Sequence, residues 1–296
     1  MSGTRMNTNL FKQLTIACAG FTLSLAAIPA NPAQAASFSF NTGSPDGKIA
    51  TASRPSSPGK VEIETGDDFI LSQQTKITKA TFTGLLTNGA TLADIQNVIV
   101  EIYRVFPKDS QNPPDGKVPT RVNSPSDVAL ASRDSSSGLT FNTTLINSNF
   151  TAANSVINGI NPIPNQTTGG EGSVSGQEVQ FNISFDDPFS LPADHYFFVP
   201  QVAVSGGDFL WLSAPKPIVS PGTPFNPDLQ TWIRNEPLQP DWLRIGTDIV
   251  AAAPFNASFS LEGTTSVPEP QSTSGLMLVA LGLGWMMRNK KKLPVL

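Results

Sequence analysis

The 296-residue sequence predicts an all-β fold: a single β-sandwich over residues 36–265, flanked by one targeting segment on each side. Apolar and polar residues alternate with a period of two in many short segments, the pattern of half-buried strands. Turn-forming residues, among them 23 glycines and 26 prolines, separate these segments at fairly regular spacing. Almost no helical periodicity accompanies them, and no internal repeat or composition break divides the segment. These features are typical of one sandwich domain.

Strands are predicted in the first half of this domain at residues 38–40, 61–64, 69–71, 77–85 and 98–106. The last of these is rich in β-branched and aromatic residues, which favours a central strand. Residues 92–96 are expected to form one helical turn, with Thr91 as its cap. Polar residues with Pro and Gly predict loops at 41–60 and 107–127.

Strands in the second half are predicted at residues 128–131, 139–146, 178–185, 196–204, 209–212, 232–233, 242–245 and 257–261. In 178–185 the apolar residues occupy every second position and should face the core. Pro200 predicts an edge strand or a bulge. Residues 205–208 predict a hairpin turn that pairs 209–212 back onto 196–204. Long irregular loops are expected at 158–177 and 215–227.

The N-terminus has the pattern of a secretory signal peptide over residues 1–35. Arg5 and Lys12 precede an apolar region at 14–28, and Ala33-Gln34-Ala35 is a small-x-small cleavage site. We expect signal peptidase to cut after Ala35, with Ala36 as the alternative. The protein is therefore expected to be exported.

The cysteine count and the net charge argue against several classes of function. Cys18, the one cysteine, lies in the signal peptide, so the mature protein would have neither disulfides nor cysteine metal sites. Residues outside 36–267 hold 6 of the 19 basic and 1 of the 23 acidic side chains, which leaves 13 basic and 22 acidic residues and a net charge of −9. This acidic balance argues against a nucleic-acid partner, which requires phosphate neutralisation by Lys and Arg.

The C-terminal segment, residues 266–296, combines three features in a fixed order. Pro268-Glu269-Pro270 comes first, a run of about 13 apolar residues follows at 275–287, and the basic cluster Arg288, Lys290, Lys291 and Lys292 comes last. As a helix the run would reach roughly 20 Å, short of the roughly 30 Å of a bilayer core. It is thus expected to be a short, transient membrane anchor. The positive-inside rule places the basic cluster on the cytoplasmic side.

This order of motif, apolar helix and basic cluster resembles the PEP-CTERM sorting signal of bacterial envelope proteins. The resemblance implies processing by exosortase, a membrane transpeptidase, near Pro268-Glu269-Pro270. It implies transient anchoring in the inner membrane, followed by display at the cell surface or release into the extracellular matrix. The ectodomain is similar to the jelly-roll-like sandwiches that often precede such anchors, through Asp67-Asp68-Phe69 and the later segment 191–196.

Candidate catalytic and metal-binding residues are few. His195 is the one histidine, and no nucleophile-elbow Gly-x-Ser-x-Gly accompanies it. The pairs Asp67-Asp68 and Asp186-Asp187 suggest a glycosidase pair or a calcium site, but adjacent strand residues point to opposite faces. The alternative is that these aspartates keep strand ends soluble. We therefore expect no cofactor, with calcium as the alternative.

Trp211, Trp232 and Trp242 are candidates for a ligand platform, because exposed aromatic rings can stack on sugars. The alternative is that they fill the core. The sequence as a whole favours a non-enzymatic surface or matrix protein, adhesive or glycan-binding, with extracellular polysaccharide as a partner. A carbohydrate-active enzyme on a jelly-roll scaffold is the other hypothesis.

Overall fold

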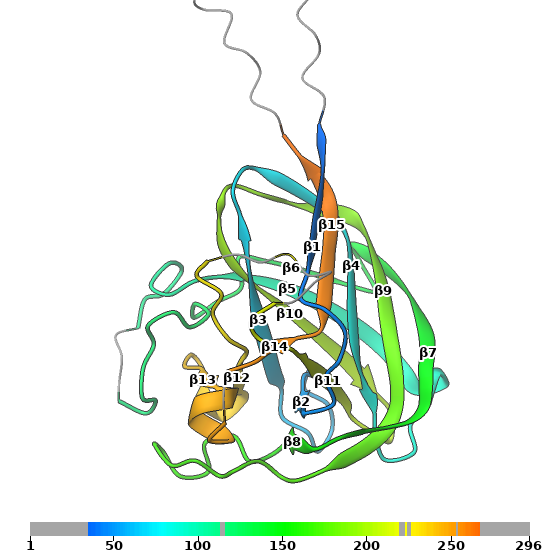
Figure 1. Cartoon of the computed structure of the whole chain (residues 1–296), viewed down its shortest axis with the longest axis vertical. Helices are drawn as coiled ribbons and strands as arrows, with labels where there is room; N and C mark the ends of the chain where they lie inside the picture. Colours follow the sequence, from blue (N-terminus) through cyan, green and yellow to red (C-terminus); the bar gives the residue numbers. More distant parts are fainter. Residues whose placement is uncertain (1–34, 113–115, 219–222, 224–225, 253, 267–296) are drawn as a thin grey trace, which may run out of the picture. The chain divides into compact units, whose positions relative to one another are not determined.

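Two β-sheets make up the part of the chain that the computed structural model describes, residues 35–112, 116–218, 223, 226–252 and 254–266 (Figure 1). The expected signal peptide, apart from Ala35, and the expected sorting segment after residue 266 lie outside these residues. The two sheets confirm the predicted all-β class.

The larger sheet has nine strands, and β4 (Thr75–Leu86) is its centre. One edge of β4 pairs along its length with β9 (Val174–Leu191), and β9 pairs in turn with β7 (Leu139–Ala152). The other edge of β4 pairs with β15 (Phe259–Thr265) and then with β11 (Phe209–Ala214). The remaining strands are β1 (Ala36–Asn41), β2 (Ile49–Ala52), β8 (Asn154–Val156) and β14 (Asn256–Ala257).

The smaller sheet has six strands in the order β13 (Leu243–Arg244), β12 (Trp232–Asn235), β3 (Ile63–Leu71), β10 (Asp194–Val204), β5 (Ile95–Arg104) and β6 (Ala131–Asp134). Short helices interrupt the strands at η1 (Leu92–Asp94), η2 (Glu236–Leu238) and η3 (Ile245–Ile249). The helical turn predicted after Thr91 is η1, where the Thr91 N–H and hydroxyl donate to the Asp94 carboxylate at 2.8 and 2.9 Å.

An aromatic core fills the space between the two sheets. Phe82 stacks on Phe181 within the larger sheet at 4.8 Å between ring centroids. Phe198 of the smaller sheet stacks on Phe259 of the larger at 5.2 Å, so the sheets share one core. The predicted alternation of β9 is confirmed, since Val179, Phe181, Ile183 and Phe185 are all buried.

The turn at residues 205–208 is not the hairpin that the sequence predicts. It carries the chain from β10 in the smaller sheet to β11 in the larger one. The turn packs against the end of β4, where the Thr87 N–H donates to the Asp208 carbonyl at 3.0 Å. A Cβ on Gly207 would lie 2.4 Å from the Thr87 carbonyl oxygen, so glycine permits this close approach. The local sequence therefore predicts that the chain reverses direction here. The contact with the end of β4 determines that β11 joins the larger sheet.

Pro200 lies in β10, an interior strand of the smaller sheet, but at a position where only one edge of the strand is paired. Pairing of β10 with β3 ends at Phe198 opposite Asp67, while pairing with β5 continues past Pro200. The Pro200 carbonyl accepts a hydrogen bond from the Ser53 hydroxyl at 2.5 Å instead. A residue without an N–H fits here because β3 has already left that edge of β10.

Candidate functional site

The three tryptophans predicted as a ligand platform are buried. Trp211, Trp232 and Trp242 expose at most 1 % of their surface, and the Trp211 and Trp242 indoles donate to the Ser258 and Ser126 carbonyls at 2.9 and 3.2 Å. The prediction of an exposed platform is therefore wrong, and core packing accounts for these residues. The alternation in β11 suggested one exposed face, but apolar clusters cover both faces of this strand.

The neighbouring carboxylates of β3 serve opposite sides of the strand, as alternation requires. Asp67 accepts from the Ala257 N–H at 2.9 Å and the Thr231 hydroxyl at 3.3 Å. Asp68 accepts from His195 Nε2 at 2.6 Å and from the Leu229 N–H at 3.1 Å. The pair therefore joins distant segments to β3 and does not form a two-carboxylate site.

Burial raises the pKa of both carboxyls, because water no longer solvates their charged forms. The negative charge of Asp68 raises the pKa of Asp67 further, whereas the hydrogen bond from His195 opposes the rise at Asp68. His195 is thus the partner of a buried carboxyl group, which gives the one histidine a structural role.

The second aspartate pair lies on the surface of β9. Arg133 Nη2 contacts the Asp187 carboxylate at 2.8 Å, and 72 % of the Asp187 side chain is exposed. Within the described ranges no group of three or more His, Cys, Asp or Glu residues has a geometry that could hold a metal ion.

A second cluster of carboxyl groups lies on the face of the smaller sheet that points away from the shared core. The Tyr103 hydroxyl donates to Glu64 Oε1 at 2.5 Å and lies 3.2 Å from Glu101 Oε2. Arg234 pairs with Glu64, and its Nη2 donates to the Tyr103 oxygen at 2.9 Å. The guanidinium also stacks 4.4 Å from the Trp242 ring centroid. Both carboxylate oxygens of Glu64 therefore have a partner, and the residue exposes 2 % of its surface.

Glu101 is the most perturbed carboxyl in this cluster. Burial, followed by the charge of Glu64 and a hydrogen bond with it, raises the pKa of Glu101 to about 7. Such a value suits a general acid. A glycosidase, however, holds its carboxyls about 5–10 Å apart to admit a sugar or a water molecule. Because Glu64 and Glu101 are hydrogen-bonded directly, no sugar fits between them.

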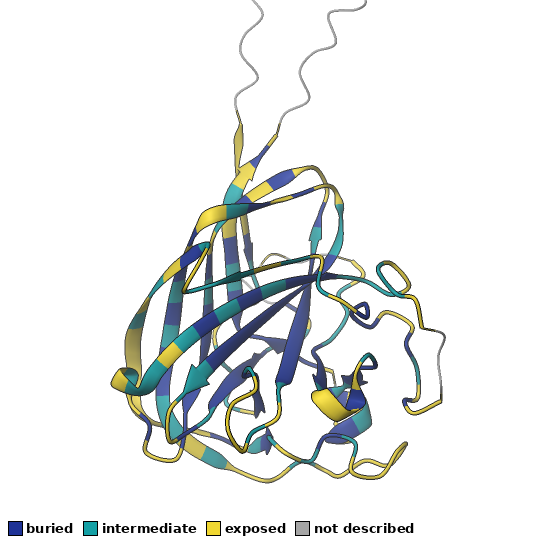
Figure 2. Ribbon diagram, turned by 180° about the vertical axis from the view of Figure 1, so that it is seen from behind, coloured by how far each residue is buried: buried dark blue, intermediate teal, exposed yellow. Residues whose placement is uncertain are grey.

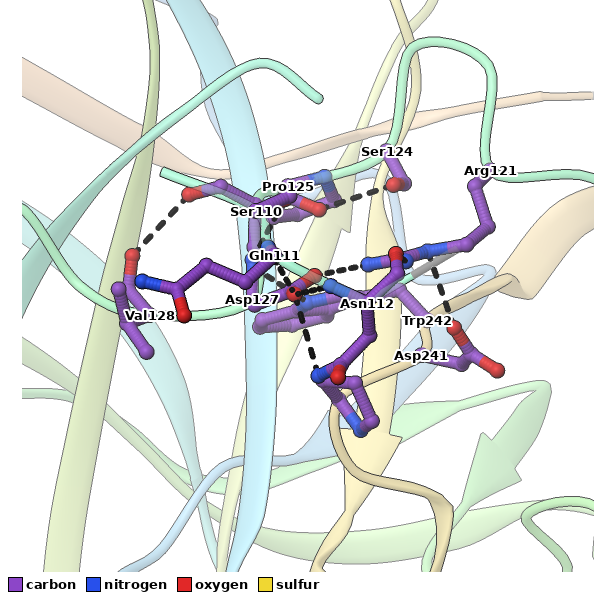
Figure 3. A network of polar contacts seen from close by, with 12 residues as sticks. Ser110, Gln111, Asn112, Arg121, Ser124, Pro125, Asp127, Val128, Asp241 and Trp242 are labelled. Atoms are coloured by element: carbon purple, nitrogen blue, oxygen red, sulfur yellow. Dashed lines mark hydrogen bonds and ion pairs between the residues drawn. The ribbon is translucent and has the colours of Figure 1, made fainter. Parts of the chain in front are cut away.

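The segment between β5 and β6 packs over part of this cluster and is fixed there by Arg121 (Figure 3). Arg121 exposes 2 % of its surface, pairs with Asp127, and forms a second ion pair with Asp241, with 2.9 Å between Nε and Oδ1. Burial alone would raise the pKa of Asp127, but the hydrogen bond from Arg121 and two backbone N–H groups outweigh it and lower the pKa. Asp241 directly precedes Trp242, so the covering segment is joined to the cluster that it covers.

A polar groove lies on the outer face of the larger sheet, where Figure 2 shows exposed and half-exposed residues along the strands. Its volume is about 280 Å³. Strands β4, β9 and β15 meet here side by side through residues that point away from the core. The polar residues that line it are Asn41, Ser44, Thr81, Thr83, Glu178, Gln180, Ser258 and Ser260. The groove thus presents hydroxyl, amide and carboxyl groups together, with Pro45 and Ile146 as apolar rims.

Glu178 is the distinctive residue of this groove. It exposes 7 % of its surface, and burial raises the pKa of its carboxyl group. Within the part of the chain that the structure describes, no ion pair involves Glu178. A largely buried carboxyl without a cation is costly unless hydrogen-bond donors approach it. Ligand hydroxyl groups are donors of that kind.

The sequence contains part of the signal for this groove. The polar positions of residues 178–184 alternate with the buried ones and must lie on one outer face. That face forms the groove only because β4 lies beside β9 and β15 beside β4, so that their Thr and Ser residues complete the lining. Partner order is a tertiary property that no local pattern specifies.

The sorting motif Pro268, Glu269 and Pro270, the basic residues Arg288, Lys290, Lys291 and Lys292, and Ala33 of the cleavage site lie outside the described residues. Ala35 is described; it is exposed and directly precedes β1. No helix in the described ranges is long and apolar enough to cross a membrane.

Comparisons with known proteins found no matching family model, no matching curated protein and no matching solved structure.

Proposed function

We propose that this is a non-enzymatic protein of the bacterial cell surface or extracellular matrix whose sandwich binds a neutral polysaccharide in the outer groove. One observation carries the proposal: the groove places seven hydroxyl and amide side chains around the buried carboxyl of Glu178, for which the described residues supply no cation. Sugars match such a surface because every hydroxyl both donates and accepts. Pro45 and Ile146 offer apolar contact for the C–H groups of a sugar ring.

The charge of the domain restricts the ligand class. Residues 36–267 carry a net charge of −9, the 13 basic less the 22 acidic side chains. Glu178 adds a carboxyl inside the groove. Anionic polysaccharides would therefore be repelled, whereas uncharged chains would not. This favours neutral glycans over uronic-acid or sulfated ones.

Delivery to the surface follows from the two targeting segments. Signal peptidase would cut after Ala35, and exosortase would process the chain near Pro268-Glu269-Pro270 after transient anchoring in the inner membrane. The resemblance to jelly-roll-like ectodomains is part of the same proposal. Intact mass measured on protein from the native envelope tests it. A chain from Ala36 to about Pro268 is expected, and one that retains residues 275–296 would contradict the processing step.

Glycan binding is tested by titrating the full chain, in detergent, with neutral and uronic-acid polysaccharides. Glu178→Gln is expected to weaken binding of the neutral chain roughly tenfold, because a hydrogen bond to a charged group contributes about 1.5–3 kcal/mol. Asp186→Asn, also on β9 but outside the groove, is the matched control and should leave binding unchanged. Equal affinity for both polysaccharides, or equal affinity of both variants for the neutral one, would contradict the proposal.

A carbohydrate-active enzyme is the second candidate: the pKa of about 7 at Glu101 supports it, whereas the direct hydrogen bond between Glu101 and Glu64 opposes a two-carboxyl site between these groups. Its test is hydrolysis of the same polysaccharides. An activity lost in Glu101→Gln but kept in Glu178→Gln would establish the enzyme and place its site on the smaller sheet.

A further inference from the structure

Strand β7 forms a long free edge of the larger sheet. Among the described strands it pairs with β9 alone, and it lies at the margin of the sheet in Figure 1. Beyond β7, the Ala153 N–H donates to the Gly47 carbonyl at 2.9 Å, so the β1–β2 connection covers only the end of this edge. Along Leu139–Leu145 the register with β9 is regular, with irregularities on both sides of Asn147. Seven regular residues exceed the usual strand length of about five to six.

The composition of this edge is unusual for an exposed strand. Leu139–Ala152 contains no Asp, Glu, Lys, Arg, Pro or Gly among its 14 residues. Leu145 and Ile146 expose 45 % and 52 % of their surface. Free edges are normally protected by charges, prolines or short length, since their unpaired N–H and C=O groups recruit other strands. In β7 the two register irregularities beside Asn147 disfavour pairing with another strand at that point. The edge of Leu139–Leu145 stays regular and has no such feature.

We infer that β7 pairs with β7 of a second copy of this chain, antiparallel about a two-fold axis, to form one sheet that continues across both molecules. The distribution of charge favours this edge as the place where two copies meet. Two copies that each carry −9 over residues 36–267 repel one another. Along Leu139–Leu145 two copies can approach without opposing charges, because the neighbours Gln180, Asn182 and Ser184 on β9 are uncharged as well; the nearest carboxyl, Glu178, lies opposite Asn147 and outside this stretch.

The opposite edge of the sheet fits a second copy less well. Strand β1 is also uncharged, but it has six residues, and its Ser39 lies opposite Glu262. Pairing through β1 would bring two copies of Glu262 close together. In the smaller sheet, the edge strand β6 has only four residues, and two of them, Arg133 and Asp134, are charged. Strand β7 is therefore the edge best suited to self-pairing.

A dimer built this way places its two outer grooves on one continuous face, since Ile146 of β7 is also a rim residue of the groove. Two grooves on one polysaccharide chain would bind with higher avidity than one. The dimer itself rests on the edge of β7 and stands whether or not the groove binds glycan.

Cysteine cross-linking tests the pairing and its register. In the full chain with Cys18→Ser, single cysteines replace Thr140, Asn142, Thr144 or Ile146, which share the outer face. Antiparallel two-fold pairing brings a residue opposite its own copy at one point only, so oxidation should give a disulfide dimer that peaks at one or two adjacent positions of this set. Lys79→Cys, exposed on β4, is the control and should stay monomeric. Equal cross-linking at all positions, or none at any, would overturn the inference.

A charge variant provides the second measurement. Thr144→Lys places like charges near one another across the proposed pair and should raise the dimer dissociation constant at least roughly tenfold in sedimentation analysis. Ser190→Lys, exposed on β9 beyond the β7 pairing, is the matched control. Thr144 does not line the groove, so glycan binding per chain should persist in Thr144→Lys. A monomeric wild type, or an oligomer that Thr144→Lys leaves intact, would contradict the dimer without affecting the glycan proposal.

Discussion

At the level of single residues, the main feature of this protein is the burial of several carboxyl groups. Asp67, Asp68 and Glu64 each expose no more than 2 % of their surface, and each is held by specific donors. Glu101 differs because one of its hydrogen-bond partners is another carboxyl, Glu64. Burial, and then Glu64, shift its pKa from 4.5 to about 7. A carboxyl perturbed in this direction opposes folding whenever it is ionised.

The pH dependence of stability follows from that shift. Below pH 4.5 Glu101 is neutral in both the folded and unfolded chains, and its contribution cancels. Between pH 4.5 and about 7 the folded chain binds the proton more tightly, so stability falls as pH rises. Glu101→Gln removes this loss and should raise the free energy of unfolding at pH 8 by roughly 2 kcal/mol, with little change at pH 4.

Urea unfolding at both pH values measures this effect. Glu262→Gln, an exposed glutamate on β15 whose side chain is 59 % accessible, is the control and should follow the wild type. An unchanged pH slope in Glu101→Gln would show that Glu101 does not titrate in this range.

At the scale of elements, segments far apart in sequence are joined through buried polar groups. The segment between β5 and β6 lacks strand periodicity, yet it packs against Trp242 and Arg234. Arg121 supplies the connection by contacting Asp127 within the segment and Asp241 beyond it. Its ring contact with Phe106, at 4.4 Å, adds apolar packing.

Removal of this arginine should therefore be costly. Arg121→Met leaves two buried carboxylates without their cation, which predicts a loss of about 3–5 kcal/mol in unfolding free energy. The matched change Arg133→Met removes a pair whose aspartate side chain is 72 % exposed, and should cost less than about 1 kcal/mol from the lost ion pair. Chemical denaturation of both variants gives the comparison, and similar losses in the two would refute the role of Arg121.

For the sandwich domain as a whole, the two ends of the described chain are adjacent. Ala36 pairs with Thr265 where β1 lies along β15. Signal cleavage after Ala35 would therefore leave β1 complete, and the C-terminal segment would leave from the same edge. Phe40 anchors β1 with its ring 5.3 Å from Phe259 and 6.2 Å from Phe69.

The cleavage position can be tested through stability. A chain that starts at Ala36 should unfold at the same temperature as one with additional leader residues. A chain that starts at Thr42 loses β1 and the packing of Phe40, and should be destabilised by at least about 3 kcal/mol. Thermal unfolding of the three chains measures this difference. If the chain from Thr42 were as stable as the chain from Ala36, β1 would not belong to the cooperative unit.

The sequence anticipated most strands correctly where alternation was strong. Residues 178–185 lie within β9 with the expected face inward, and residues 98–106 overlap β5, an interior strand as predicted. Lengths were underestimated, since β7 and β9 have 14 and 18 residues. Residues 144–149 of β7 are all exposed, so no buried face imposes alternation there.

The local sequence alone determined that this chain is all-β and which face of each strongly alternating strand is apolar, because backbone sterics and a period of two act within a few residues. Only the tertiary structure decided that β10 and β11 belong to different sheets, that the three tryptophans are interior, and that Glu64 meets Glu101. Those outcomes depend on which strands become neighbours. Burial of apolar surface across the whole domain sets that choice, and residues distant in sequence share in it.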